Sequence, residues 1–462
     1  MARRSSGIDE TMSPQEKRTA YSLAAVYTVR MLGLFMILPI FTAYGAELKG
    51  HTPFLIGLAL GIYGLTQALF QVPLGMLSDR LGRKPVIVFG FLFFITGSVI
   101  AALAHTITGI IIGRAFQGAG AISASVMALA ADLTRDEHRT KIMASIGVSI
   151  GIAFTAGLAL GPLLNSWIGV PGIFWTTAAL GLVAIAIVSF VVPSPLTHHR
   201  HRDTEVVASS FGRVLRHPEL LRLDFGIFVM QFILTATFVV MPILLAHLTG
   251  VPVTRSWELY LPVMIVAFLI MVPFIIIAEK RRHMRRTVRA AIAILVITNV
   301  AYLYAERSLP AMVAGLIIFF SAFNTLEASL PSLVAKTAPP DQKGTAMGVY
   351  STSQFLGIFL GGTIGGAAYG AWGITGTLLI NAALAGVWLV VASGMREPRY
   401  VASYVLRLKD PGAGEEALRA RLANVPGVDE VAIAADEGVA YLKIDRAVLQ
   451  ESDLRAFAAD SP

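Results

Sequence analysis

The strongest constraint on the fold of this chain is a series of long apolar segments. Twelve runs of roughly 17–27 residues are each long enough to cross a bilayer, which takes about 20 residues. Inside a bilayer the backbone has no water to bond, so these segments must be helical. They lie at 20–44, 54–78, 86–104, 107–132, 142–165, 171–192, 224–248, 257–279, 288–305, 310–335, 345–370 and 374–394. We therefore predict an all-α membrane protein with twelve transmembrane helices.

The composition excludes several other classes of protein. Of the 462 residues, 55% are hydrophobic and only 14% are charged, whereas soluble domains are about one quarter charged. The chain contains no cysteine, so it cannot form disulfides or thiolate metal sites. We find no nucleotide-binding loop, metal-ligand set, nucleophile–base pair or signal peptide. We therefore expect neither an enzyme nor a bound cofactor.

The distribution of positive charge predicts the orientation. With both termini placed in the cytoplasm, the inner segments before the last span hold 23 lysines and arginines and the outer loops hold 3. Cytoplasmic loops carry such an excess in membrane proteins. The net charge of +8 is thus explained by topology, and no nucleic-acid partner is required.

A cytoplasmic loop at 193–223 divides the chain into two halves of six spans each, 1–192 and 224–395. It carries a short run of basic side chains, His198 to Arg202. This run is either a metal or lipid-headgroup site or a solvated linker, and the sequence favours the linker.

The pattern of residues 400–460 is typical of a small soluble domain. Alternating apolar residues predict strands at 404–408, 428–434 and 439–444, and helical patterns fill 414–425 and 449–458. The order β-α-β-β-α predicts a cytoplasmic α+β domain with a ferredoxin-like pattern. It is either a regulatory module that binds a ligand or protein partner, or a passive cap.

The loop after the second span combines glycines, one acid and three bases. These residues are Gly75, Asp79, Arg80, Gly82, Arg83 and Lys84. The bases alone would serve to orient the chain, but the acid and the glycines have no part in that role. Asp132 ends the fourth span at the same membrane face, so Arg83 can pair with Asp79 or Asp132. We predict that this cluster is a conformational gate.

Three charges lie well inside predicted spans, away from the span ends: Arg30, Arg114 and Glu327. A charge at the bilayer centre costs about 2.5–3.5 kcal/mol on insertion scales, so these side chains should face protein or a cavity. A buried carboxylate can carry a proton, which makes Glu327 the first candidate for proton coupling. The alternatives are a static Arg–Glu pair and, for Arg114, a structural cation.

Other polar and small residues within the spans form stripes. The polar ones either line a cavity or link helices by hydrogen bonds; they are Tyr63, Gln67, Gln71, Gln231, Asn324, Tyr350 and Gln354. Small residues at intervals of about four allow close helix packing. They are Gly147, Gly151, Gly157, Gly161 and Pro162 in the fifth span, with Gly361 and Gly365 in the eleventh.

Several of these patterns resemble motifs of the major facilitator superfamily. Residues 75–84 match Gly-x-x-x-Asp-Arg-x-Gly-Arg-Lys, and Arg114-x-x-Gln117-Gly118 resembles a second motif. Residues 157–162 resemble an antiporter motif in part, because Asn165 and Ser166 stand where that family usually has two glycines. The stretches 30–33, 61–67 and 343–355, with the appended domain, resemble the YajR-type branch of the superfamily.

This resemblance implies a function as well as a fold. It implies a carrier of small molecules in the inner membrane of a Gram-negative bacterium, driven by the proton gradient and grouped with drug:proton antiporters. The cluster at 75–84 would latch the two halves together, and Arg114 would assist proton transfer. A non-transporting sensor that signals through the C-terminal domain is the alternative. A sensor has no need to keep gating and proton groups, which favours transport.

Overall fold

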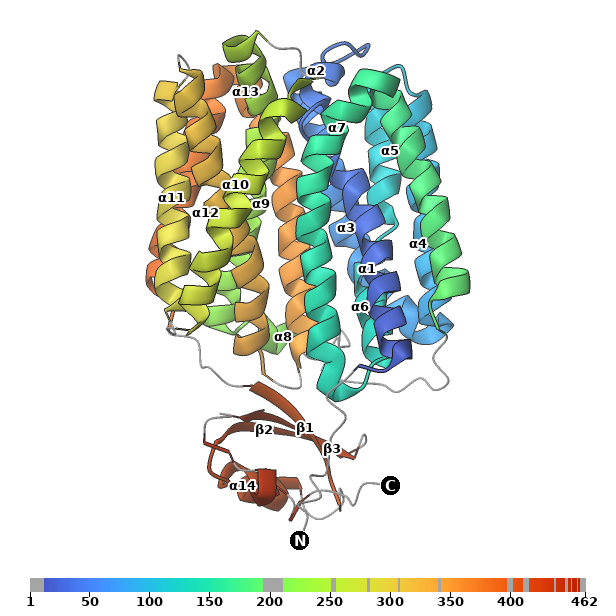
Figure 1. Cartoon of the computed structure of the whole chain (residues 1–462), viewed down its shortest axis with the longest axis vertical. Coiled ribbons are helices and arrows are strands. Elements are labelled where there is room, and N and C mark those ends of the chain that lie inside the picture. The colour runs from blue at the N-terminus through green and yellow to red at the C-terminus, as the bar shows by residue number, and fades with distance from the viewer. Residues whose placement is uncertain are drawn as a thin grey trace.

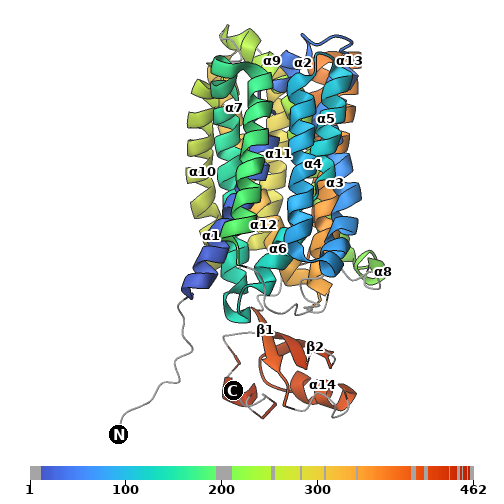
Figure 2. The ribbon, with the colours of Figure 1, turned by 90° about the vertical axis from the view of Figure 1, so that its right-hand side faces the viewer.

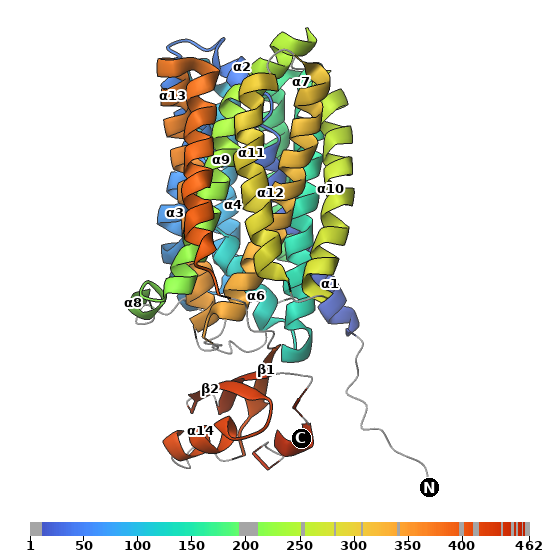
Figure 3. The same ribbon diagram turned by 90° about the vertical axis from the view of Figure 1, so that its left-hand side faces the viewer.

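The computed structural model is a long helical bundle with a small α+β domain beyond one end (Figure 1). We call that end of the bundle the domain end and the opposite one the far end. Figure 2 looks onto α3, α4 and α5, and Figure 3 onto the helices of the second half. The structure describes residues 12–193, 211–250, 255–280, 283–305, 308–339, 342–396, 402–409, 415–435, 438–444, 448–449, 451–454 and 456–457.

The first half of the bundle is built from seven α-helices and a final π-helical turn. They are α1 (Pro14–Phe35), α2 (Phe41–Gly45), α3 (Pro53–Leu81), α4 (Arg83–Leu103), α5 (Ile107–Ala119), α6 (Ser123–Asp132), α7 (Asp136–Ala186) and η1 (Ile187–Val191). The second half contains α8 (Phe211–Val214), α9 (Pro218–Thr249), α10 (Trp257–Lys280), α11 (Met284–Ala305), α12 (Leu309–Thr337) and α13 (Lys343–Ser393).

The prediction of a twelve-helix bundle in two halves is confirmed. Among the described residues, nine helical segments are long and apolar enough to cross a membrane. Two of these, in α7 and α13, are each interrupted by one glycine with left-handed backbone, Gly169 (φ 67°) and Gly373 (φ 66°). Only glycine adopts this conformation readily, so each long helix folds back there and supplies two spans. With α1 the total is twelve.

Two predicted spans differ from the continuous helices that we expected. The span at 20–44 ends as a helix at Phe35 and passes through turns before α2. Pro39 lies in this break, where it cannot donate a backbone hydrogen bond and its ring would clash with the carbonyl group of Phe35. The span at 107–132 is divided into α5 and α6 around Gly120. Both breaks free backbone carbonyl groups inside the bundle.

Two further predictions concern the central loop. The second half begins earlier than residue 224, because α9 starts at Pro218 with His217 as its N-cap. Proline is favoured in the first turn of a helix, where its missing N–H is not needed. The histidine and arginine cluster at 198–202 lies outside the described residues.

The surface of the bundle suits lipid and its interior does not. Large apolar side chains are exposed along it, such as Phe190 (83%), Val390 (72%) and Leu269 (65%). Polar side chains such as Gln67, Gln117 and Asn299 are instead fully buried. A soluble protein exposes polar side chains to water and seldom exposes so many large apolar ones. The chain is therefore a multi-pass membrane protein.

The two halves meet closely along a line of glycines that we call the glycine seam. It joins Gly57, Gly61 and Gly64 of α3 to residues 355–366 of α13. A Cβ atom on Gly61 would lie 2.5 Å from the carbonyl oxygen of Phe359, and one on Gly362 would lie 2.5 Å from that of Gly57. Since α3 begins at the far end and α13 at the domain end, the seam runs from the middle of the bundle to the far end.

Other glycines hold helices together within each half. A side chain on Gly157 or Gly161 of α7 would strike Phe35 and Met36 at the end of α1. One on Gly361 or Gly365 of α13 would strike Phe232 or Ala236 of α9. The fifth and eleventh spans thus pack in the same way against the first and seventh, as expected for two related halves. Pro162 follows directly in α7, within the helix.

The packing prediction is wrong for the first two glycines of the fifth span. Gly147 and Gly151 are exposed, and a Cβ atom at either would have no neighbour within 4 Å. They lie on the outer face of α7, roughly opposite Ile142, Ile146 and Ala153, which are buried against the rest of the first half.

The C-terminal domain has the predicted topology. Its strands β1 (Ala402–Arg407), β2 (Val428–Ala434) and β3 (Val439–Ile444) form an antiparallel sheet in the order β1-β3-β2. Helices α14 (Glu415–Ala423) and α15 (Glu451–Leu454) complete β-α-β-β-α. Leu418, Leu422 and Leu454 pack with the apolar face of the sheet. The last helix is shorter than predicted.

An ion pair fixes the start of α1 to the loop between α6 and α7. Arg135 donates from its backbone N–H, its Nε and its Nη2 to the Glu16 carboxylate, over 3.0–3.2 Å. Glu16 also caps its own helix through Ser13. These bonds hold the pKa of Glu16 at about 2, below its ordinary value of 4.5. The pair lies before the predicted span, at the domain end.

Replacing Gly61 should prevent closure of the far end. In Gly61→Leu the side chain would overlap the α13 backbone, so the halves should separate there. Because the chain has no cysteine, spin labels on His51→Cys and Ala371→Cys can report the distance across this end. We expect a longer distance in Gly61→Leu and an unchanged one in Gly147→Leu, where a side chain meets open space. Equal distances in all variants would contradict the role of the seam.

The Glu16–Arg135 pair should stabilise the protein in a pH-dependent way. A lowered carboxyl pKa contributes stability above about pH 4.5 and loses it as pH falls toward about 2. At neutral pH, Glu16→Gln should cost about 1–2 kcal/mol, because water screens the half-exposed Arg135. Thermal unfolding in detergent measures this. The difference in Tm from the native protein should shrink below pH 4.5; a constant difference would contradict the assignment.

Candidate functional site

Arg30 is the centre of a buried polar cluster in the first half. It is 1% exposed and lies in the middle of α1. Its Nε donates to the Tyr63 hydroxyl over 3.1 Å, one Nη donates to the carbonyl oxygen of Gly120 over 2.5 Å, and the other donates to Gln67. The helix break at Gly120 therefore leaves a carbonyl oxygen free to accept a hydrogen bond from the Arg30 guanidinium.

Arg114 of α5 belongs to the same cluster. It is 1% exposed and lies over the ring of Tyr63, with its Cζ 5.0 Å from the ring centroid. Its Nη1 donates to Gln117, which donates in turn to Ser98. Its Nε and Nη2 receive no hydrogen-bond partner from the described residues. Tyr63 thus contacts both arginines, through its hydroxyl and its π face.

Glu327 lies in a separate cluster in the second half. Its carboxylate accepts hydrogen bonds from Gln231 Nε2 of α9 (3.0 Å) and Gln354 Nε2 of α13 (3.4 Å). The alternative of a static Arg–Glu pair is wrong for this structure: Arg30 is held by Tyr63, Gln67 and Gly120, and Glu327 by two neutral amides. The interior thus contains opposite charges that do not form a direct pair.

The remaining polar residues of the two stripes also face the interior. Gln71 accepts a hydrogen bond from Gln67 over 3.0 Å. Tyr350 is 3% exposed and its hydroxyl has no partner among the described residues. Asn324 is half-buried, one turn before Glu327 on α12. The stripes thus contain both hydrogen-bond links between helices and groups left open to a ligand or water.

The basic loop after the second span forms the predicted charge cluster. Arg83, at the start of α4, donates to Asp79, to Ser78 Oγ (2.9 Å) and to Asp132 Oδ2 (3.1 Å). It thus pairs with both candidate acids rather than with one. Gly82 makes the turn at φ 94°, Gly75 approaches Ala124 of α6, and Lys84 donates to the Val192 carbonyl oxygen over 2.6 Å. Arg80 is exposed.

Sequence reasoning missed Asp224, a buried acid of the second half. It is 5% exposed, and neither carboxylate oxygen has a hydrogen-bond partner among the described residues. We assigned it to the boundary of the seventh span, where an acid is unremarkable. The Pro218 helix start would have placed it almost two turns inside α9.

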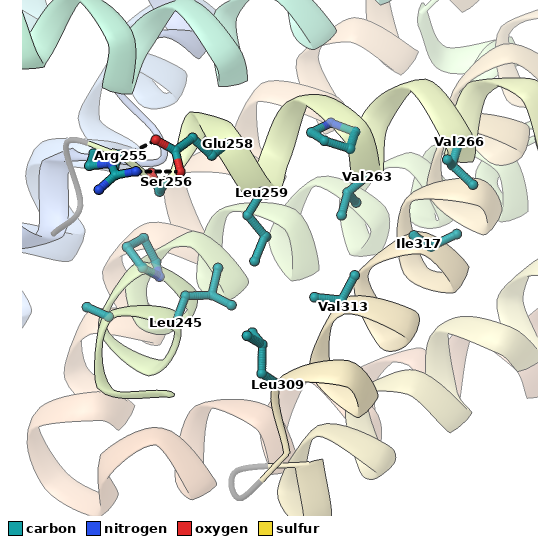
Figure 4. Close-up of a pocket in the computed structure, with 13 residues that line it drawn as sticks. Leu245, Arg255, Ser256, Glu258, Leu259, Val263, Val266, Leu309, Val313 and Ile317 are labelled. Carbon is teal, nitrogen blue, oxygen red and sulfur yellow. Dashed lines mark hydrogen bonds and ion pairs between the residues drawn. The ribbon is translucent and has the colours of Figure 1, made fainter. Parts of the chain in front are cut away.

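A cavity of about 420 Å³ lies apart from these clusters, toward the far end of the second half (Figure 4). Leu245 of α9, Leu259 and Val263 of α10, and Leu309 and Val313 of α12 are among its lining residues. The Arg255–Glu258 ion pair lies at one side. None of the residues proposed from the sequence lines it, so it is not the polar site that we predicted.

A twelve-span bundle with two six-helix halves and a charged interior is the architecture of a membrane transporter. The sequence matches the Major Facilitator Superfamily over residues 23–362 and 281–407, and the YajR YAM domain over residues 406–453. It is 48% identical over 446 residues to the inner membrane transport protein YajR of Escherichia coli K12, covering 96% of this chain and 98% of that one. The chain belongs to the major facilitator superfamily.

Other relatives agree with this membership. An uncharacterized transporter of Buchnera aphidicola (subspecies Acyrthosiphon pisum) is 35% identical over 349 residues, 75% of this chain and 89% of that one. A bacterial homologue of the human lysosomal transporter Spinster, inward-facing and occupied, has the same fold, with TM-score 0.67 and 13% identity over 83% of this chain and 97% of that one. The protein is thus a membrane transporter of this superfamily, with a small-molecule substrate.

Removing Asp79 should weaken the charge cluster and open the domain end. Asp79→Asn leaves Arg83 with a single carboxylate partner, so the connection of α3 to α4 and α6 loosens. Spin labels on Tyr21→Cys and Thr337→Cys should report a longer distance across the domain end. Lys17, an exposed cation at the same end that takes no part in the cluster, gives the control, Lys17→Gln. If Asp79→Asn leaves both this distance and transport unchanged, the gate assignment is refuted.

Proposed function

We propose that the protein is a proton-coupled exporter of small molecules that works by alternating access. The proton gradient is its only driving force, with no bound cofactor. The observation that carries the proposal is the Glu327 carboxylate, which lies inside the bundle with neutral amides as its hydrogen-bond donors.

The amide partners suit a group that gains and loses a proton. A buried carboxylate without an opposite charge costs several kcal/mol, and protonation removes most of that cost. A glutamine side chain both donates through its NH₂ group and accepts through its oxygen. Gln231 and Gln354 can therefore hold Glu327 in either protonation state, whereas an arginine partner would fix it as the anion.

Arg30 and Arg114 contribute in a different way from Glu327. A guanidinium keeps its proton in proteins, so these residues act as fixed positive charges and not as proton carriers. We infer that substrate and proton exchange at Glu327 in alternation, as an antiport mechanism requires.

Alternating access follows from the two contacts at opposite ends. The glycine seam allows the halves to close at the far end, and the Arg83 cluster organises the domain end. A carrier alternates by opening one end while the other is closed. We propose that protonation of Glu327 and occupation by substrate bias this equilibrium in opposite directions.

The setting of the transporter follows from charge and from its relatives. We place it in a bacterial inner membrane, because its Escherichia coli relative is named an inner membrane transport protein. The positive-inside pattern puts both termini, and with them the C-terminal domain, in the cytoplasm. There the domain is available to a regulatory ligand or protein partner.

Glu327→Gln should separate transport from its driving force. The variant keeps the side-chain shape, and one partner amide can rotate to accept from the new NH₂ group, but it cannot bind or release a proton. Proteoliposomes with an imposed pH gradient and a panel of small molecules identify a transported compound. For that compound, Glu327→Gln should lose uphill accumulation and keep exchange of labelled for unlabelled substrate. Glu258→Gln, at an exposed acid, is the control. Full gradient-driven transport by Glu327→Gln would overturn the proposal.

A further inference from the structure

Asp224 is a buried acid that the proposed mechanism does not yet use. It lies on α9, near the domain end, with 5% of its surface exposed. Its two carboxylate oxygens have no hydrogen-bond partner among the described residues. Buried polar groups almost always have such partners, so an unpartnered carboxylate calls for an explanation.

The position of Asp224 relates it to Glu327. Asp224 and Gln231 are seven residues apart, which puts them on one face of α9 about 10 Å apart along the axis. Gln231 is the residue that donates to Glu327. Asp224 therefore lies two turns closer to the domain end than the Glu327 cluster, on the same side of the helix.

Tyr350 connects the two acids from a second helix. It lies on α13 one turn before Gln354, the other donor to Glu327. Its hydroxyl is buried without a partner among the described residues. Tyr350 lies seven residues after the start of α13 and Asp224 six after the start of α9, so the two are at about the same depth on helices that pack together at Gly357 and Phe228. A hydroxyl group both accepts and donates a hydrogen bond. Asp224, Tyr350 and the partly exposed Glu327 thus follow one another through the domain-end portion of the second half.

Two arginines at the domain end of the second half have other partners. Arg222, two residues before Asp224, pairs with Glu219. Arg289 of α11 donates to the carbonyl groups of Ala392 and Ser393 at the end of α13. Neither arginine forms an ion pair with Asp224 in the structure, so proton binding is the direct way to neutralise this carboxylate.

We propose that Asp224 is a second proton-binding site and that it passes protons between the domain end and Glu327. This inference rests on the proposed function, since it gives the route by which Glu327 exchanges its proton. Asp224 takes a proton from water at the domain end. Its O–H bond then breaks as the next acceptor, a water molecule or the Tyr350 hydroxyl, takes the proton and releases its own. The last O–H bond forms on Glu327, and no net charge remains on the intermediates.

Infrared spectroscopy tests this without any knowledge of the substrate. The full chain in lipid is titrated with acid, and the C=O stretching bands of protonated carboxyl groups are recorded. We expect one band to disappear in Asp224→Asn and a different one in Glu327→Gln. Glu219→Gln, at the partly exposed acid of the same helix that already pairs with Arg222, is the matched control and should keep both bands.

The relay is tested by the rate of isotope exchange. On transfer to D₂O, the Glu327 band should shift severalfold more slowly in Asp224→Asn and in Tyr350→Phe than in the native protein or Glu219→Gln. A missing Asp224 band, or an unchanged exchange rate at Glu327, would overturn the relay and leave the proposed function standing. A missing Glu327 band would instead contradict the proposed function itself. Native-like bands for the remaining acid show that each variant is folded.

Discussion

Uncompensated charge in a low-dielectric interior is the constraint on which this structure depends. Arg30, Arg114, Glu327 and Asp224 are all inside the bundle, and the structure pairs none of them directly with an opposite charge. Each such charge costs several kcal/mol unless neighbouring dipoles offset it. The break in the fourth span offsets part of the cost, because the freed Gly120 carbonyl oxygen accepts from Arg30. Irregular backbone at membrane depth is thus coupled to the buried charge.

The second constraint is how closely the helices approach. Lipid gives no hydrophobic force that drives apolar helices together, so contact depends on packing and small residues. In α13, Gly357, Gly361 and Gly365 face α9 of the same half, and Gly362 and Gly366 face α3 of the other half. One glycine-rich stretch therefore has two separate faces. The first belongs to the fixed structure of a half, and the second to the contact that an alternating carrier must form and release.

Much of this architecture could be predicted from the sequence, for physical reasons. Hydrocarbon thickness sets the length of a span, so apolar runs gave the helices, and alternation of apolar residues gave β2 and β3 to the residue. The cluster around Arg83 also followed, because residues 79–84 are close in sequence and Asp132 ends a span at the same face. The Glu327 partners were predicted as polar residues of the interior but not as its donors.

Prediction failed for contacts that depend on three-dimensional packing. The contacts of Arg30 depend on the break at Gly120 in another span, and the sequence around residue 30 does not predict that break. The difference between Gly151, which is open, and Gly161, which touches Met36, depends on which face of α7 the neighbouring helices cover. Asp224 was missed because its burial depends on where α9 begins and on the α13 side chains beside it. Each failure concerns a contact between segments distant in the chain.

The location of these features suggests how proton binding and conformation are connected. Gln354 and Tyr350 lie on α13 beside the acids, and the glycine seam begins at Phe355 of the same helix, one residue after Gln354. A change in the hydrogen bonds of Glu327 therefore acts on the helix that forms the contact between the halves. A helix is rigid along its axis, so a small displacement at Gln354 is carried to Gly362 and Gly366 without a chain of intermediate side chains. Gln354, which donates to the proton site, and the α13 side of the seam thus lie on the same helix.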